Sequence, residues 1–346
     1  MKMTVLCAGL GSLHAGWAAI DELALILSRC FQAEMLAPKV LAPSWMRRVT
    51  ERKKLRFETV ASRGGDVLFV VARGPEDLAV IRSIQDARSR FAQIHAFVTD
   101  SYFQGGFVAE TADYDSITVT AHEDMAYPAQ KFGITVHQLY QGTDCLQWAP
   151  RAELRREIDI MAFGRTPASY QAALTQRFHS MDSPYLYLHS PLGNLAGPTV
   201  QRERAMLFKL LHRSRISLAF HLMVEPHGNR PRSMMVTSRW LESLLSGCIV
   251  AGRRPLSRMA DEMLDWTGAT IELPQAPQDG VHALLSLLAD NDAWAGQRRA
   301  NIHHTMRRHD WRERIGSLCA LHGWETPAIL QHEREQLAEL AETWRS

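Results

Sequence analysis

One carboxylate, Glu242, stands alone in a helical pattern that is otherwise mostly apolar. The run from Trp240 to Leu245 predicts a helix that Gly247 ends, and Cys248 to Ala251 predicts a buried strand after it. An acid in such a helix is tolerated where it accepts hydrogen bonds, and a vicinal diol such as that of ribose offers two hydroxyl donors. The pattern therefore favours a nucleotide site. The alternative is an ordinary exposed acid beside Arg239.

A second carboxylate, Asp100, directly follows the predicted strand Ile94 to Thr99 and opens a polar loop that contains two glycines. Open parallel sheets bind ligands beyond the carboxyl ends of their strands. A carboxylate at this position could take the proton of an attacking hydroxyl group, so Asp100 is the candidate general base. His122, on a later loop, is a second and poorer candidate. The alternative for Asp100 is a turn held by local hydrogen bonds.

The first predicted strand, Thr4 to Ala8, is followed by Gly9 and Gly11, which let the chain turn closely into a helix. His14 occupies the third glycine position of the G-x-G-x-x-G dinucleotide fingerprint. The incomplete fingerprint disfavours a dehydrogenase. His14 could contact a ligand at this turn, and a capping or buried histidine is the alternative.

Length and charge limit the class of protein. A chain of 346 residues is too long for one compact core and suits two domains. The formal net charge of +2 supplies no broad positive field, so nucleic acid is not an expected partner. No segment approaches the roughly 18 to 20 apolar residues that a membrane span needs. We therefore expect a cytoplasmic protein.

Two further features of the composition bear on partners. The five cysteines are scattered without metal-ligand spacing, and the pair His303-His304 has no completed ligand set, so we predict no metal site. The basic run from Arg47 to Arg56 could bring one edge of the protein to an anionic membrane, at the inner face. A solvated helix face is the alternative for this run.

Short apolar runs alternate with helical ones along the whole chain, which predicts an α/β fold of two doubly wound domains. The first domain should span residues 1–150, the second 151–325, and a helix in 326–346 should cross back to the first. Nearly continuous apolar strands indicate burial on both faces. The strands expected in addition to those above are 67–72, 117–120, 136–139, 158–163, 185–189, 216–220 and 270–273.

Five segments resemble, in order, elements of GT-B glycosyltransferases of the glycosyl transferases group 1 type. They are Gln141 to Pro150, Asp159 to Arg165, Ser214 to Phe220, Thr237 to Val250 and Arg307 to Ile315. The resemblance covers roughly residues 136 to 320. Many retaining members carry a second glutamate eight residues before the position of Glu242, where this chain has Met234. The chain is therefore more similar to the divergent spore-maturation-type branch, which keeps an Arg-x-x-Glu pattern, and the resemblance does not carry over the stereochemistry.

The resemblance implies two Rossmann-like domains that face a central cleft, and transfer of a sugar from a nucleoside-diphosphate sugar to an acceptor hydroxyl group. It implies that Glu242 binds the ribose and that Arg165 meets the diphosphate, without a metal or a cofactor. The turn at Gly9 and Gly11 would face the phosphates, and Asp100 and His14 would be catalytic. The remaining expected donor contacts are Asn229, Arg230, Thr237, Ser238 and Arg239.

The acceptor stays open and could be a glycan, a protein or a small molecule. The family implies a place in bacterial glycan biosynthesis. Two other functions remain possible on the same architecture. A nucleotide-sugar epimerase would turn over the donor without an acceptor, and a non-catalytic sugar-nucleotide or partner-binding protein would bind the donor without transferring it.

Overall fold

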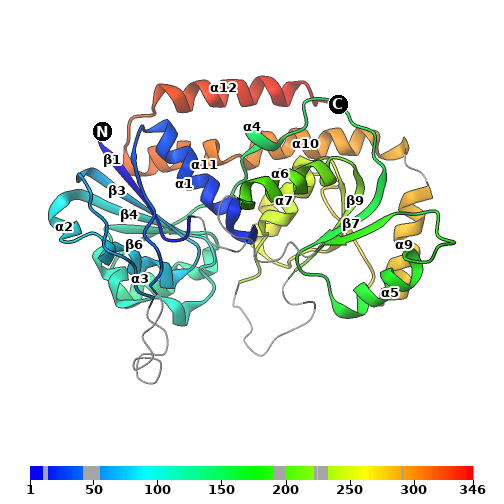
Figure 1. Ribbon diagram of the computed structural model, residues 1–346, viewed down its shortest axis with the longest axis horizontal. Helices are drawn as coiled ribbons and strands as arrows, with labels where there is room; N and C mark the ends of the chain where they lie inside the picture. Colours follow the sequence, from blue (N-terminus) through cyan, green and yellow to red (C-terminus); the bar gives the residue numbers. More distant parts are fainter. Residues whose placement is uncertain are drawn as a thin grey trace.

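Two parallel β-sheets, one in each half of the chain, form the framework of the protein (Figure 1). The computed structural model describes residues 1–10, 15–41, 55–190, 199–221, 224, 233–289 and 292–345. The first sheet has the strand order β2-β1-β3-β4-β5-β6 and the second has the order β11-β10-β9-β7-β8. The strands are β1 Met3–Cys7, β2 Glu34–Leu36, β3 Gly65–Ala72, β4 Phe91–Val98, β5 Ser116–Val119, β6 Thr135–Gln138, β7 Ile158–Phe163, β8 Tyr187–Ser190, β9 Ser214–Phe220, β10 Ile249–Arg253 and β11 Ile271–Glu272.

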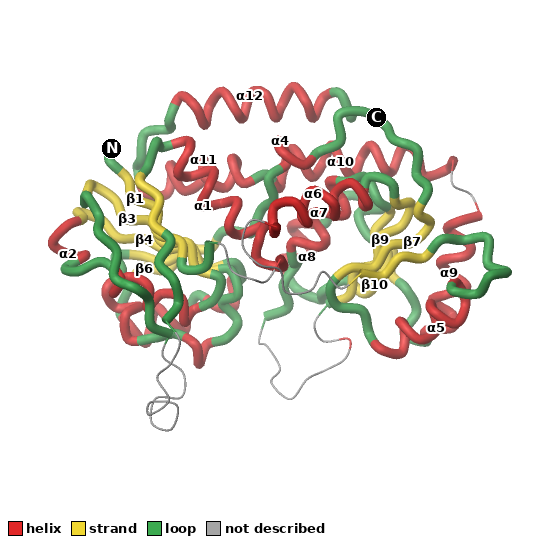
Figure 2. The backbone as a smooth tube through the Cα atoms, in the orientation of Figure 1, coloured by secondary structure: helices red, strands yellow, loops and turns green. Residues whose placement is uncertain are grey.

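Helices cover both faces of each sheet, and the two sheets lie at opposite ends of the molecule with α6, α7 and α8 between them (Figure 2). The α-helices are α1 Ala18–Cys30, α2 Ala87–Arg90, α3 Ala126–Phe132, α4 Cys145–Trp148, α5 Ala168–Phe178, α6 Thr199–Leu211, α7 Ser238–Leu245, α8 Arg258–Met263, α9 Pro277–Ala289, α10 Ala295–His309, α11 Trp311–His322 and α12 Ala328–Glu342. Short 3-10 helices are η1 Ala15–Trp17, η3 Pro75–Ser83, η4 Gln104–Gly106, η5 Ala109–Asp113, η6 His122–Asp124 and η8 Asp292–Trp294.

The burial of the strands explains why the sequence predicts this fold. All residues of β1 and of β7 are buried, as parallel strands covered by helices on both faces must be. The predicted fold class, two doubly wound α/β domains, is confirmed. Gly247 adopts a φ of +70° directly after α7 and ends that helix as predicted. The short edge strand β2 was not predicted.

The chain returns to the first domain at α11, which is earlier than residue 326, the boundary expected from the sequence. Trp311 and Ile315 of α11 lie in the same hydrophobic cluster as β1, β3 and α1. The Trp311 indole N–H donates to the carbonyl of Ala19 at 2.9 Å, and its ring meets Phe97 edge-on at 5.8 Å. Burying this large aromatic side chain against the first sheet fixes the point of return.

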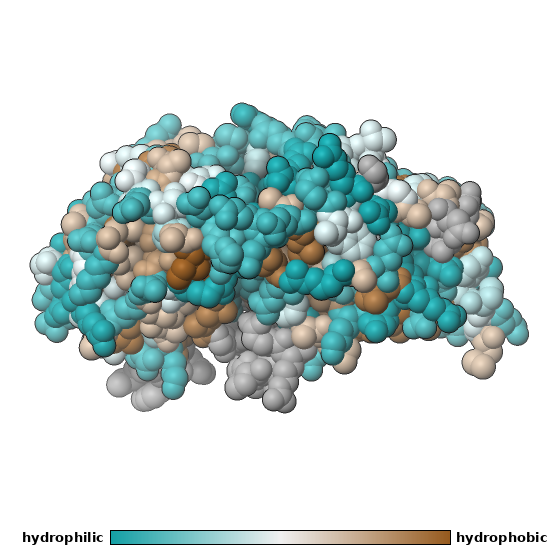
Figure 3. Space-filling view, turned by 90° about the horizontal axis from the view of Figure 1, so that it is seen from above, coloured by the Kyte–Doolittle hydropathy of each residue, from teal (hydrophilic) through white to brown (hydrophobic). Residues whose placement is uncertain are grey.

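Helix α12 then runs along the upper edge of the molecule, above α11 and α10 (Figure 1). Its buried residues, Leu330, Leu337 and Ala341, face the protein. The surface seen from the α12 side is mostly hydrophilic, with small hydrophobic patches (Figure 3). Trp344, just beyond α12, donates its indole N–H to the carbonyl of Pro150 at 3.2 Å. The end of the chain is thereby tied to the linker between the two sheets.

Two crossings of the chain lie side by side at the domain junction. The Thr143 amide donates to the His309 carbonyl at 2.9 Å, and the Trp311 amide donates to the Thr143 carbonyl at 3.1 Å. A Cβ atom on Gly142 would lie 2.9 Å from the same His309 carbonyl, so this close approach requires glycine. Two segments that the sequence marks separately, Gln141 to Pro150 and Arg307 to Ile315, therefore pack against each other at the junction.

A buried arginine connects the segments of this junction through ion pairs. Arg312 is 2% exposed, and its guanidinium pairs with Asp144 at 2.8 Å, Asp310 at 3.2 Å and Glu333 at 2.6 Å. Asp310 also caps α11 by accepting from the Arg312 amide at 2.6 Å. One side chain thus connects the linker, the start of α11 and α12.

In the described part of the chain, no helix combines the length and the apolar character that crossing a membrane requires. The basic edge Arg47–Arg56 lies outside the described residues except for Leu55 and Arg56. Its membrane contact and the cytoplasmic location therefore stay predictions.

Neutral histidines hold α11 against the first sheet. The rings of His95 and His322 lie 4.0 Å apart, and the His137 ring lies 5.8 Å from that of His322. Burial lowers the pKa of His95 to about 4 and that of His322 to about 3. The neighbouring Asp115 raises the pKa of His95, but its effect is smaller than that of burial. The packing therefore requires uncharged rings.

We expect the free energy of unfolding to fall as the pH drops from 6.5 toward 4. An unfolded histidine binds its proton near pH 6.5, whereas folded His95 does so only near 4, so acid favours the unfolded state. His95 alone should cost about 1 to 2 kcal/mol by pH 5. Urea denaturation between pH 7.5 and 5 measures this loss. The variant His95→Gln, which can still bond Ser116, should show a weaker pH dependence, and an unchanged dependence would contradict the assignment.

Candidate functional site

The carboxyl ends of strands from both sheets meet at the domain junction. Asp124, in the turn after β5, accepts from the Ser233 hydroxyl at 3.0 Å, and Thr120 lies 3.8 Å from the sulfur of Met235. Gln141 of the linker donates to the Val236 carbonyl. The segment before α7 is thus held against the end of the first sheet. Ligands of open α/β sheets bind at such ends, where the strand order reverses.

Two arginines of the second domain stand together at this edge. Arg165 follows β7, and its carbonyl accepts from Nη1 of Arg239 at 2.7 Å. The Arg239 guanidinium also lies over the Phe163 ring at 5.8 Å. Gly164 has a φ of +70°, and a Cβ atom there would lie 2.3 Å from Nη2 of Arg239. Glycine at 164 therefore permits both the turn and the close approach of the arginine.

Both guanidiniums are available as positive charge. Arg165 is exposed, whereas Arg239 is half-buried. Burial lowers the pKa of Arg239 to about 10, and the adjacent Arg165 contributes to this lowering. Arg239 therefore remains protonated at neutral pH. The structure brings these two predicted donor residues together.

Asp100 faces this pair from the first domain. It follows β4, and its amide donates to the Arg73 carbonyl at 2.7 Å. Burial raises the pKa of Asp100 to about 7, while the positive charge of Arg165 opposes the rise. Asp100 and Arg165 therefore lie near enough to interact although they come from different domains. A carboxyl group with this pKa is matched to general base catalysis near neutral pH.

Tyr102 joins Asp100 at the same edge. Burial raises the pKa of the Tyr102 hydroxyl, and the charges of Asp100 and Arg165 also act on it. Its ring lies 4.3 Å from that of Phe103, which is 48% exposed. The carboxylate therefore stands beside an aromatic surface that is partly open to solvent.

The turn after β1 is closed by an arginine that the sequence analysis did not select. Arg73 follows β3 and donates to the carbonyl of Gly9 and to Oδ1 of Asp21, the latter at 3.1 Å. A Cβ atom on Gly9 would lie 2.1 Å from Cζ of Arg73. Burial raises the pKa of Asp21 to about 6, and the charge of Arg73 opposes this rise. Gly9 is thus needed so that Arg73 can lie across the turn.

Glu242 is buried in an ion-pair network instead of lining an open surface. It is 4% exposed, and its Oε1 accepts from Nη1 of Arg204 at 2.6 Å. Nε and Nη2 of Arg204 donate to Glu22 of α1. Glu22 also accepts from the Trp148 indole at 2.6 Å. Arg204 therefore joins α7 to the first domain. The contact between Glu242 and a ribose stays a prediction.

The other predicted residues are placed as follows. Thr237 precedes α7 with a φ of −86° and no side-chain cap hydrogen bond, and Ser238 is the first residue of the helix. The backbone amides of this helix start are thus not capped by the Thr237 side chain. Gly11, His14, Asn229 and Arg230 lie outside the described residues. His122 opens η6 after β5, and its ring meets that of Tyr140 at 6.3 Å.

Some of the missed residues carried a signal. Arg73 follows a predicted strand just as Arg165 does, so the same criterion selects it. Glu22 follows Asp21 in a helical run whose other residues up to Leu27 are apolar. Arg204 is one of several charged residues in its helix, and nothing in the sequence distinguishes it.

Comparison with known proteins gives one family match and several structural neighbours. Residues 189–320 match the family described as Glycosyl transferase-like. A comparison of the sequence with curated proteins gives no match. An α-glucosyltransferase in complex with UDP and a 13-mer DNA containing a HMU base has a TM-score of 0.52 at 10% identity, over 91% of this chain and 99% of that one. An α-glucosyltransferase with UDP and A:G-mismatch DNA gives 0.51 at 12% identity, over 91% and 98%.

A third structure is larger than this chain. A point mutant of TarM from S. aureus, solved with Fondaparinux, alpha-GlcNAc-glycerol and UDP, has a TM-score of 0.48 at 9% identity. The match covers 74% of this chain and 55% of TarM. The two α-glucosyltransferases show that the fold is shared along nearly the whole chain. Residues 189–320 are therefore similar to glycosyl transferase-like proteins, and the chain has the GT-B fold of these two structures.

Proposed function

We propose that this protein transfers a sugar from a nucleoside-diphosphate sugar to an acceptor hydroxyl group at the junction of its two domains. The observation that carries the proposal is the position of Asp100 after β4 of the first sheet and of the Arg165–Arg239 pair after β7 of the second, at the same domain junction. A base and a phosphate-binding cation are the two groups that such a displacement needs. The α-glucosyltransferases of the same fold were solved with UDP, which supports a nucleoside diphosphate as the donor part.

The donor diphosphate would be bound by Arg165 and Arg239, aided by the backbone amides at the start of α7. Guanidinium groups and helix N-termini both stabilise phosphate oxygens. Because two arginines stand where the leaving group would lie, we infer that they neutralise its charge and that transfer needs no added metal.

Asp100 would act on the acceptor side. As the acceptor oxygen bonds to the anomeric carbon, its proton passes to the Asp100 carboxylate. The bond between the anomeric carbon and the phosphate oxygen breaks, and the nucleoside diphosphate leaves with the electron pair. Closure of the two domains would exclude water, which otherwise competes with the acceptor.

The test is turnover of a panel of nucleoside-diphosphate sugars with EDTA present. We expect one donor to release its nucleoside diphosphate faster when a mixture of sugar and glycan acceptors is added. Conversion of the donor to an epimer without an acceptor would instead assign the protein to the epimerases. Stoichiometric binding without release would assign it to the non-catalytic binding proteins.

A separate prediction concerns Glu242 and the ribose. If Glu242 accepts from the ribose hydroxyls, Glu242→Gln should weaken UDP binding by about 1 to 3 kcal/mol. The variant also alters the contact with Arg204, so affinity alone does not isolate the ribose contact. Calorimetric titration with UDP and with 2′-deoxy-UDP isolates the ribose contact, because the two ligands differ only in the 2′-hydroxyl group. The preference for UDP should shrink in the variant, and an unchanged preference would leave Glu242 with only its contact to Arg204.

A further inference from the structure

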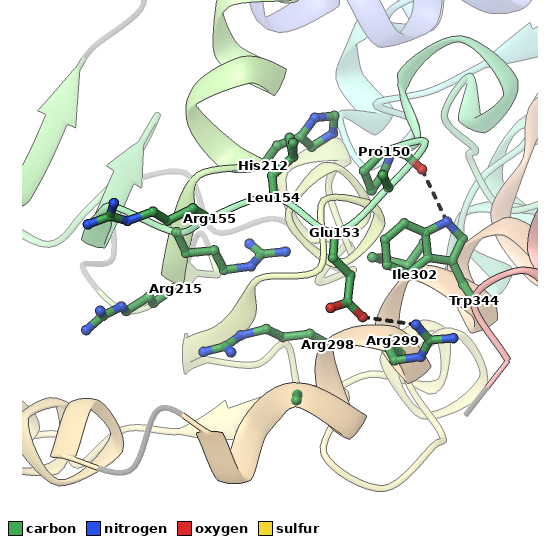
Figure 4. Close-up of a pocket in the computed structure, with 13 residues that line it drawn as sticks. Pro150, Glu153, Leu154, Arg155, His212, Arg215, Arg298, Arg299, Ile302 and Trp344 are labelled. Carbon is green, nitrogen blue, oxygen red and sulfur yellow. Dashed lines mark hydrogen bonds and ion pairs between the residues drawn. The ribbon is translucent and has the colours of Figure 1, made fainter.

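A second concave site lies at the opposite end of the donor-domain sheet (Figure 4). Its cavity of about 310 Å³ is bounded by the linker after Pro150, the first residues of β9, the first turns of α10 and Trp344. β7 and β9 begin beside it, at Ile158 and Ser214. The candidate sugar-transfer site lies at the carboxyl ends of the same strands, so the two sites are separate.

The lining of this cavity is strongly positive. It contains five arginines and one carboxylate, that of Glu153. His212 adds no charge at neutral pH, because burial lowers its pKa to about 4. The arginines are Arg155, Arg156, Arg215, Arg298 and Arg299. The formal charge of the lining is therefore +4, in a protein whose whole chain carries only +2.

Carboxylates offset only part of this charge. Arg299 pairs with Glu153 at 2.9 Å, Arg215 pairs with Asp159 at 2.8 Å through Nη1, and Arg155 lies 3.8 Å from Glu157. Nε of Arg215 is buried and has no hydrogen-bond partner among the described residues. With Glu157 and Asp159 counted beside Glu153, three carboxylates stand against five arginines, and the formal charge of the group is +2.

Arg156 is held in place by neutral groups. Its guanidinium donates to the carbonyls of Leu211 and Ser214 and, at 2.8 Å, to that of Ser246. These carbonyls fix the position of the guanidinium without cancelling its charge. Its stem is half-buried, so the arginine cannot turn away into solvent freely. A cation fixed in this way is preorganised for an anion.

The N-terminal end of α10 adds to the positive electrostatic potential of the cavity. Ala295 lines the cavity and is the first residue of this 15-residue helix. Trp294 makes no side-chain cap hydrogen bond, and the first turn contains no acidic residue. The 3-10 helix η8 leads directly into α10, so it is the dipole of α10, and not a set of free amides at Ala295, that favours an anion here. Helix and guanidiniums therefore act in the same direction.

We propose that this cavity binds the phosphate or pyrophosphate group of a phosphorylated small molecule. Several guanidiniums, of which Arg156 is held by backbone carbonyls, are the chemistry that recognises phosphate oxygens. The volume lies at the lower end of ordinary ligand pockets, about 300 to 1,000 Å³, and exceeds what one phosphate needs. Leu154, which is 43% exposed, supplies apolar surface for the rest of the molecule. The inference is independent of the proposed sugar transfer.

The linker and Trp344 both contribute to the cavity, and both connect the two domains. Occupation of the site would therefore stabilise this connection. We expect inorganic pyrophosphate to raise the thermal stability of the full chain more than chloride does at equal ionic strength.

The test is calorimetric titration of pyrophosphate in the presence of saturating UDP. We expect binding that the double variant Arg215→Gln/Arg298→Gln weakens at least tenfold. The control Arg177→Gln/Arg213→Gln removes the same charge from exposed arginines of the same domain that do not line the cavity, and it should bind as the wild type does. The Arg155 side chain is 88% exposed, so Arg155→Glu should leave the stability of the fold unchanged. This variant should also weaken pyrophosphate binding.

A second arm uses vesicles that contain phosphatidic acid. Binding of these vesicles but not of pyrophosphate, lost in the cavity variants, would identify the phosphate as that of a lipid headgroup. Pyrophosphate that UDP displaces, and that Arg165→Gln rather than the cavity variants abolishes, would place the anion in the transfer site and overturn the proposal. Equal binding by all variants would overturn it as well.

Discussion

Replacing Arg204 with methionine should lower the free energy of unfolding by about 3 to 5 kcal/mol. Arg204 is 4% exposed, and it pairs with Glu22 and Glu242, which are 2% and 5% exposed in their side chains. Methionine fills much of the space but leaves two buried carboxylates without their cation. Removing one partner of a buried ion pair is costly for this reason.

Urea denaturation of Arg204→Met measures this loss. Lys209→Met is the matched control, because it removes a positive charge from an exposed position of the same helix. It should change stability by no more than about 0.5 kcal/mol. Adding Glu22→Gln and Glu242→Gln to Arg204→Met should recover part of the loss, since no buried charge then remains unpaired. If Arg204→Met unfolds like the control, the network does not hold the domains together.

The second large effect concerns Asp100. Asp100→Asn should reduce the rate of sugar transfer by about 100-fold to 10,000-fold, because the amide cannot take the proton of the acceptor hydroxyl. The variant should still fold and bind UDP. Glu123→Gln, which neutralises an exposed carboxylate in the turn after β5, is the control and should keep its activity. Transfer that survives in Asp100→Asn at more than about a tenth of the wild-type rate would remove Asp100 as the base.

The pH profile gives an independent check of the same residue. A base must be deprotonated to act, and the pKa of Asp100 is raised to about 7 by burial. The rate should therefore rise with pH up to about 7 and level off above it. Asp21, whose pKa is raised to about 6, is the other group that titrates nearby. Residual activity of Asp100→Asn should no longer show the step near pH 7.

Where the sequence succeeded, it did so through short-range patterns. The continuous apolar run of β7 and the glycine that ends α7 are local signals, and both elements appear where they were predicted. The sequence also places Asp100 and Arg165 at the domain junction, since each follows a strand whose carboxyl end must face it.

The missed features depend on contacts between distant segments. Arg204 and Glu22 are 182 residues apart, and nothing in the composition of either helix pairs them. The return of the chain at α11 depends on Trp311 packing against the first sheet, which a charged, helical pattern does not reveal. The edge strand β2 has only three residues, too few to show a period.

The central claim, a nucleotide-sugar site between the two domains, is tested most directly by calorimetric titration of UDP, GDP, dTDP and CMP without metal. The account predicts that one diphosphate binds with a stoichiometry of one to one, and that Arg165→Gln and Arg239→Gln each weaken it about tenfold or more. Arg177→Gln should bind it as the wild type does. Absence of binding for every nucleotide, or equal binding by all variants, would contradict the assignment of the site.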